Sequence, residues 1–184
     1  MSELKTWPLL GEEVLLNSKV FDVMSRRCLS PKDGKEKKFM AIKAPEWANT
    51  LALTPKREVI LVRQFRYGSR EFSLELPGGA IDKGQTPEEA AKRELTEETG
   101  FVGQNFRHLC TLRPNPALFD NFIHTYVCDG AVKSGQTHFD ENEAIEDILI
   151  PVEDLAKFIT DGRIDHALMV AAISLFLVRE GLNK

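Results

Sequence analysis

Residues 75–101 read ELPGGAIDKGQTPEEAAKRELTEETGF and contain a glycine pair followed by a helix with clear start and stop signals. Thr86 is a typical N-cap residue, a proline follows it at the first helical position, and Glu89 stands three residues after Thr86, as in a capping box. Gly100 is typical of the position just past a helix C-terminus. The stretch therefore predicts a helix over residues 87–99.

Three glutamates occupy one face of this predicted helix. At 100° per residue Glu94 and Glu98 lie one turn apart with Glu97 alongside, so the carboxylates gather within about 6 Å. Hard divalent cations such as Mg²⁺ bind oxygen ligands of this kind and keep waters that a phosphate can displace. The glycine pair Gly78–Gly79 lets bare backbone approach a pyrophosphate and offer a carbonyl ligand. We expect Mg²⁺ here, with Mn²⁺ as an alternative.

Each feature alone has an ordinary structural explanation. A glutamate-rich helix face is usually solvated, a double glycine is usually a turn, and a single arginine such as Arg93 usually forms a surface ion pair. The glycine pair, the capped helix and the charged pairs all stand in one register, however, and this coincidence favours a site.

The composition excludes several classes of protein. The chain has 184 residues, 42% of them hydrophobic and 28% charged, which suits one substantial core. Its net charge of -4 disfavours binding to nucleic acid or acidic membranes by charge alone. Three cysteines without regular spacing indicate neither a disulfide framework nor a zinc site, and we read no export signal or membrane segment. We therefore expect a cytoplasmic protein.

The rest of the chain predicts a mixture of strands and helices. Turn residues at 30–34 separate two strand-like runs and predict a hairpin, while residues 1–18 could be an arm or a partner-binding segment. A further strand is expected to stop at Pro77-Gly78-Gly79. The expected strands are residues 20–29, 37–43, 48–53, 59–65, 72–76, 106–112, 122–128 and 147–150, and the later helices are a short one opened by Pro151 and a final one at 165–180. The fold class is α+β with a mixed β-sheet.

The stretch resembles the signature of the Nudix hydrolases, G-x5-E-x7-R-E-U-x-E-E-x-G-U, in which U is aliphatic. It stands here as Gly79-x5-Gln85-x7-Arg93-Glu94-Leu95-Thr96-Glu97-Glu98-Thr99-Gly100-Phe101. Two positions depart from the signature: Gln85 lacks the charge of the first glutamate, and Phe101 replaces an aliphatic residue. The resemblance implies a Nudix-type α/β/α sandwich, with residues 1–40 as an N-terminal β segment able to act as a dimer-exchange arm and residues 41–184 as the Nudix hydrolase domain.

Features outside the signature are similar to the ADP-ribose and nucleoside-diphosphate-sugar pyrophosphatase branch of the family. The whole resemblance covers about residues 20–182, and the features outside the signature are Glu75, Gln64-Phe65-Arg66, Pro116, the run Asp140-Glu141-Asn142-Glu143 and the run 161–165. The resemblance implies Mg²⁺-dependent hydrolysis of a small nucleotide sugar. ADP-ribose is the first candidate substrate, and GDP-mannose or another sugar nucleotide is the second. Members of this branch commonly form homodimers by exchanging N-terminal strands, so a homodimer is implied as well.

The resemblance also implies roles for the residues of the signature. Glu94 and Glu98 are the principal metal ligands, Glu97 is a third ligand or a proton acceptor, and the Gly78 carbonyl is an additional ligand. Arg93 orients the glutamates, because its planar guanidinium can hold one carboxylate while a neighbour binds metal.

Other residues are implied as the base or as substrate contacts. Glu143 is the first candidate for the general base, Glu141 the second and Glu97 the third. Arg66 and Glu75 are candidate substrate-binding residues, and Arg113 is a weaker one. The aromatic candidates for stacking on the base are Trp47, Phe21 and Tyr67.

Two other classes of function stay open on the sequence alone. A catalytically silent Nudix module could sense a nucleotide, which Gln85 favours and the intact glutamates disfavour. A Nudix hydrolase for nucleoside triphosphates, dinucleoside polyphosphates or RNA caps is the other alternative, because the signature reads the diphosphate and not what flanks it.

Overall fold

The computed structural model describes residues 4–138 and 144–182. The chain divides into two compact units. The first consists of Met1–Pro45 and Arg113–Phe122, and the second of Glu46–Leu112 and Ile123–Lys184. The division at residue 40 that the sequence suggested stays a prediction.

The first unit is a three-stranded antiparallel sheet in the order β1 (Leu9–Asn17), β2 (Asp22–Leu29), β3 (Glu36–Lys43). The expected hairpin is confirmed, because β2 pairs with β3 through the turn at 30–34. Strand β1 lies in the segment whose structure the sequence left open, and its pairing with β2 makes it a strand.

The segment Arg113–Phe122 joins the first unit although it lies far along the chain. The N–H of Ile42 donates to the carbonyl of Leu118 over 2.7 Å, and the guanidinium of Arg26 binds Asp120 over 2.6 Å. The hydrogen bond to Asp120 raises the pKa of Arg26 and outweighs the smaller, opposite effect of burial.

The second unit is built on a mixed seven-stranded sheet, in the order β12-β5-β4-β10-β9, with β6 beside β5 and β7 beside β4. Strand β4 pairs in parallel with β10 and antiparallel with β5. Residues 78–80, expected to be part of a turn, instead form β7 and pair with the start of β4. The strand bounds are β4 Trp47–Leu53, β5 Glu58–Arg66, β6 Glu71–Glu75, β7 Gly78–Ala80, β9 Phe106–Leu112, β10 Ile123–Asp129 and β12 Ile145–Pro151, with a small pair of β8 Phe101–Val102 and β11 Val132–Lys133.

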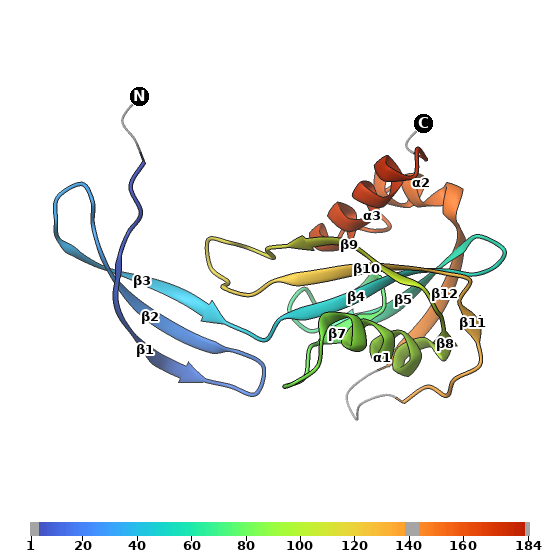
Figure 1. Cartoon of the computed structure of the whole chain (residues 1–184), viewed down its shortest axis with the longest axis horizontal. Helices are drawn as coiled ribbons and strands as arrows, with labels where there is room; N and C mark the ends of the chain where they lie inside the picture. Colours follow the sequence, from blue (N-terminus) through green and yellow to red (C-terminus); the bar gives the residue numbers. More distant parts are fainter. Residues whose placement is uncertain (1–3, 139–143, 183–184) are drawn as a thin grey trace. The chain divides into compact units, whose positions relative to one another are not determined.

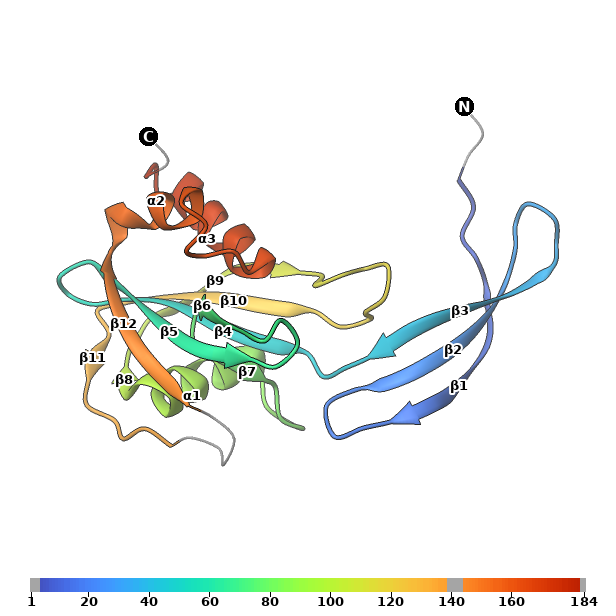
Figure 2. The ribbon, with the colours of Figure 1, turned by 180° about the vertical axis from the view of Figure 1, so that it is seen from behind.

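Helices cover both faces of this sheet. Helix α1 (Pro87–Thr99) lies on one face, and α2 (Leu155–Thr160) and α3 (Ala167–Arg179) lie on the other, as Figures 1 and 2 show from opposite sides. The expected α/β/α sandwich is confirmed. The helix predicted over residues 87–99 has these bounds in the structure, and the final helix is slightly shorter than predicted.

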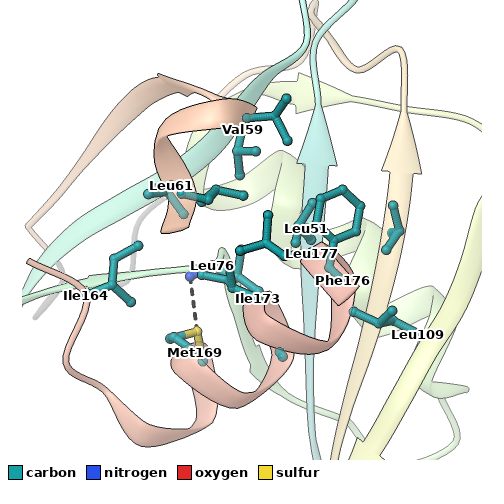
Figure 3. Packing of buried hydrophobic residues seen from close by; sticks show 14 of the residues in the cluster. Leu51, Val59, Leu61, Leu76, Leu109, Ile164, Met169, Ile173, Phe176 and Leu177 are labelled. Atoms are coloured by element: carbon teal, nitrogen blue, oxygen red, sulfur yellow. Dashed lines mark hydrogen bonds between the residues drawn. The ribbon is translucent and has the colours of Figure 1, made fainter. Parts of the chain in front are cut away.

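The main hydrophobic core lies between the sheet and α3. Side chains from β4, β5 and β9 pack there against Ile173, Phe176 and Leu177 of α3, all at most 4% exposed (Figure 3). Burial of apolar area on this scale is the main stabilising contribution to the fold. Within residues 4–138 and 144–182, no helix is long and apolar enough to cross a membrane.

Candidate active site

The register of α1 is fixed at both of its ends. The Thr86 hydroxyl accepts the N–H of Glu89 over 3.3 Å, and a Glu89 carboxylate oxygen accepts the N–H of Thr86 over 2.8 Å. At the other end Gly100 adopts a left-handed conformation with φ of 67° and donates to the carbonyl of Thr96. The predicted caps are confirmed, and they determine which residues of the helix face β7.

The two glycines of β7 are required for space. A Cβ on Gly78 would lie 2.4 Å from the carbonyl oxygen of Ala48 and 2.4 Å from Cβ of Asn49. A Cβ on Gly79 would lie 2.4 Å from a carboxylate oxygen of Glu94. Since neither glycine has a positive φ, close approach rather than turn conformation explains them.

Glu98 is held against β7 by backbone. Its residue is 6% exposed, and its Oε2 accepts the N–H of Gly78 over 2.8 Å. A carboxylate that accepts a backbone N–H keeps a fixed orientation and a satisfied oxygen despite its burial. Helix α1 and strand β7 are therefore joined at this side chain.

Arg93 contacts the two other glutamates of the helix. Its guanidinium lies 2.9 Å from Glu94 and 2.7 Å from Glu97, and donates to the carbonyl of Ala80 over 3.0 Å. Burial lowers the pKa of Arg93, but the hydrogen bond to Glu97 and the charges of Glu94 and Glu97 outweigh it, and the net pKa is raised. Its Nε has no hydrogen-bond partner among the described residues.

The donor set of these glutamates fits a hard divalent cation. Within the part of the chain that the structure describes, no three Asp, Glu, His or Cys side chains already converge as metal ligands. Glu94 and Glu97 face Arg93, and Glu98 faces Gly78. The fit rests on the chemistry of three neighbouring carboxylates and on the space beside Glu94 that only glycine leaves open.

Arg66 and Glu75, both expected to contact substrate, bind each other. The guanidinium of Arg66 donates to both carboxylate oxygens of Glu75, over 2.7 Å each, across the β5–β6 hairpin. Glu75 is 3% exposed, whereas the side chain of Arg66 is 46% exposed. Burial raises the pKa of Glu75, but the hydrogen bonds and charge of Arg66, with smaller effects of His166 and Ser73, outweigh it, and the net pKa is lowered.

The remaining candidates lie at several places. Trp47 begins β4 and packs partly buried against the core, and Tyr67 is 73% exposed at the β5–β6 turn. Phe21 and Arg113 belong to the first unit, where the guanidinium of Arg113 lies 4.3 Å from the ring centre of Phe122. The candidate bases Glu141 and Glu143 lie outside the described residues.

Two residues that the sequence did not single out, Asn49 and Met169, take part in the local structure. Asn49 of β4 pairs with Gly78, and Met169 of α3 contacts both Asn49 and the backbone just before β7. Gln85, which departs from the signature, accepts the N–H of Asp82 with its side chain over 3.3 Å and so closes the turn before α1. A single amide in the apolar run of β4 was the signal for Asn49.

Comparisons with known proteins find relatives of similar sequence and a solved structure of similar fold. A family model described as NUDIX domain matches residues 47–173. An ADP-ribose pyrophosphatase of Bacillus subtilis (strain 168) is 28% identical over 175 residues, which cover 95% of this chain and 94% of that protein. The ADP compounds hydrolase NudE of Escherichia coli (strain K12) is 32% identical over 68% of this chain and 66% of its own length. A crystal structure of an ADP compounds hydrolase aligns with a TM-score of 0.84 and 26% identity, over 99% of this chain and 97% of that chain.

Proposed function

The chain belongs to the Nudix family and is a hydrolase, and from this membership we propose that it cleaves the pyrophosphate bond of nucleoside diphosphate sugars in a reaction that depends on Mg²⁺. The products are a nucleoside monophosphate and a sugar phosphate. One observation carries the proposal: Arg93 and Gly78 hold the carboxylates of Glu94, Glu97 and Glu98 beside bare glycine backbone.

The chain's own residues supply binding and orientation. Glu94 and Glu98 would hold the cation, with Glu97 and the Gly78 carbonyl as further ligands. A bound divalent cation supplies charge neutralisation and Lewis-acid polarisation at the diphosphate. Arg93 keeps the neighbouring carboxylates in place, since its guanidinium binds two of them at once.

Hydrolysis needs a water and a base. The water oxygen forms a bond to one phosphorus, the bond from that phosphorus to the bridging oxygen breaks, and a water proton passes to a carboxylate. We propose Glu143 as this base, followed by Glu141 and Glu97. The N–H of His138, the last described residue before that segment, donates to the carbonyl of Glu97 over 2.9 Å, which supports this assignment.

ADP-ribose is the first substrate that we propose, and GDP-mannose or another sugar nucleotide is the second. The names of two similar proteins state action on ADP-ribose or ADP compounds, which supports the adenine nucleotide. The Arg66–Glu75 pair supports recognition of phosphate or ribose, because the half-exposed guanidinium presents a fixed positive charge at the surface.

We also propose that the protein acts as a homodimer through its first unit. Apolar side chains of the β1–β3 sheet are about half exposed, and a second copy would bury them. They include Leu10, Val14, Leu16, Phe39 and Met40. A Leu16→Asp variant is expected to be monomeric in size-exclusion chromatography with light scattering, at concentrations where the parent is dimeric.

One assay tests the proposed activity. The protein is incubated with Mg²⁺ and a panel of ADP-ribose, GDP-mannose, nucleoside triphosphates and dinucleoside polyphosphates, and the products are separated by chromatography. We expect AMP and ribose 5-phosphate from ADP-ribose. Cleavage of triphosphates alone would move the protein to another branch of the family, and absence of any cleavage would favour a nucleotide-sensing module.

A further inference from the structure

A methionine sulfur lies against the backbone that leads into β7. Met169 of α3 is 3% exposed, and its Sδ accepts the N–H of Leu76 over 3.2 Å (Figure 3). The side-chain amide of Asn49 donates to the same sulfur over 3.8 Å. The thioether therefore receives two N–H groups in an otherwise apolar cluster.

This contact gives a reason for methionine over leucine at position 169. Leu76 stands between β6 and β7, outside both strands, so its N–H has no place in the sheet ladder. A buried N–H without an acceptor is costly, and a thioether, although a weak acceptor, satisfies it while filling apolar space. Leucine would fill the space but could not accept the N–H of Leu76.

Asn49 connects the sulfur of Met169 to strand β7. It is 2% exposed and is the pairing partner of Gly78, whose missing Cβ leaves room for Cβ of Asn49. Because a thioether only accepts, it faces the amide nitrogen of Asn49 and fixes the orientation of this side chain.

The corner from Leu76 to Gly78 is thus held from both faces of the sheet. Helix α3 holds Leu76 through Met169, and α1 holds Gly78 through Glu98 over 2.8 Å. Strand β4 adds a third contact, in which the N–H of Thr50 donates to the carbonyl of Pro77 over 2.9 Å.

We propose that Met169 is a positioning residue for the hydrolysis. Its sulfur holds Leu76 and Asn49 so that the Gly78 backbone meets the Glu98 carboxylate. The kinetic consequence rests on the proposed function, whereas the contact itself can be measured without any substrate.

Replacement of the sulfur atom alone tests this proposal. Of the four methionines, Met24 and Met40 are changed to Leu, which leaves Met169 and the first residue. The protein is then produced with methionine, with selenomethionine, or with norleucine, which has a methylene in place of sulfur. Amide hydrogen exchange is followed at Leu76 and Gly78, and kcat and KM for ADP-ribose are measured.

With norleucine we expect exchange at these two amides to become roughly tenfold faster. We expect kcat to fall about tenfold at unchanged KM, because the metal ligands lose orientation while the substrate contacts stay. Selenium accepts as sulfur does, so selenomethionine should restore both values. Leu177→Met, a reverse exchange at a buried position on the same helix, should leave exchange at Leu76 and Gly78 unchanged.

Unchanged exchange at Leu76 and Gly78 with norleucine, or faster exchange throughout the core, would overturn the proposal. Faster exchange at the two amides with unchanged kcat would also overturn it. If even the methionine protein cleaves no substrate, the proposed function fails, and the exchange data still decide whether the sulfur holds the corner.

Discussion

Gly79 and Glu94 are packed so closely that no side chain fits between them: a Cβ on Gly79 would lie 2.4 Å from Oε1 of Glu94. The clash is with a carboxylate that we assign to metal binding, so a substitution at Gly79 should affect activity more than folding.

A Gly79→Ala variant should therefore lose about 100-fold in kcat/KM while it loses about 1–3 kcal/mol in free energy of unfolding. Gly68→Ala is the matched control, because a Cβ there meets nothing within 4 Å. Steady-state kinetics and urea unfolding of both variants give the comparison. Full activity of Gly79→Ala would mean that Glu94 is not a ligand.

Glu98→Gln separates charge from shape. The amide oxygen can still accept the N–H of Gly78, so stability should stay near that of the parent, while activity should fall by roughly 100-fold or more because a proposed metal ligand loses its charge. Titration of activity with Mg²⁺ should show a higher half-saturating concentration. Glu88→Gln, on the exposed first turn of the same helix, should retain activity.

The Arg66–Glu75 pair predicts a pH dependence of stability. The pKa of Glu75 is lowered in the folded protein from its ordinary value of 4.5. The ionised Glu75 therefore contributes to folding stability above pH 4.5, and this contribution is lost as the pH falls through the folded pKa. In Arg66→Met burial outweighs the smaller opposing effects of His166 and Ser73 and raises this pKa, so the variant should gain stability relative to the parent as the pH falls from 7 toward 4.5.

Near pH 7 Arg66→Met should be less stable by about 1–3 kcal/mol, a range kept low because Arg66 is half exposed. Urea unfolding at a series of pH values measures this difference. Arg63→Met is the control, since Arg63 forms an ion pair with the exposed Glu146 and should show a small effect at every pH. A difference that widened toward low pH would contradict the assigned pairing.

The N-cap of α1 should contribute measurably to stability. Thr86→Ala removes the hydroxyl that accepts from Glu89 and should cost about 1 kcal/mol, whereas Thr86→Ser should restore most of it. Thermal unfolding of the three proteins tests the cap. Equal stability of the Ala and Ser variants would show that the hydroxyl makes no net contribution.

The three cysteines should differ in reactivity. Burial, with a smaller effect of the charge of Asp129, raises the pKa of Cys128 to about 11, and Cys110 is also buried with a raised pKa. Cys28 is partly exposed, so a disulfide reagent at pH 8 should modify it in the native protein and the other two only after unfolding. Cys28→Ser should abolish the native reaction.

The elements that the sequence predicted well are those with local signals. Helix α1 carries its own caps, and the β2–β3 hairpin carries its own turn, so neither needs knowledge of the rest of the fold. Strand β7 could not be predicted in this way. Its glycines have low strand propensity, and its partner residues 47–49 lie about thirty positions earlier. Strand β7 therefore forms only through tertiary pairing with β4.

The same difference between local signals and tertiary contacts applies to the candidate site. Helical spacing alone predicted that Glu94, Glu97 and Glu98 share one face, whereas the role of Arg93 came from the resemblance to the signature. The structure places Arg93 against Glu94 and Glu97. The bond between Arg66 and Glu75 depends on the β5–β6 register, and the contact of Met169 with Leu76 depends on how α3 packs on the sheet. Neither of these two contacts can be predicted from residue spacing along a single helix or strand.

The insertion of Arg113–Phe122 into the first unit has a consequence for how the protein is made. The β1–β3 sheet is synthesised early, yet the segment that contacts Ile42 and Arg26 leaves the ribosome only after β9 has been translated. The β1–β3 sheet therefore lacks its contacts with residues 113–122 until much of the second unit has already been synthesised. A gene truncated after residue 45 would therefore encode the β1–β3 sheet without the segment that contacts Ile42 and Arg26.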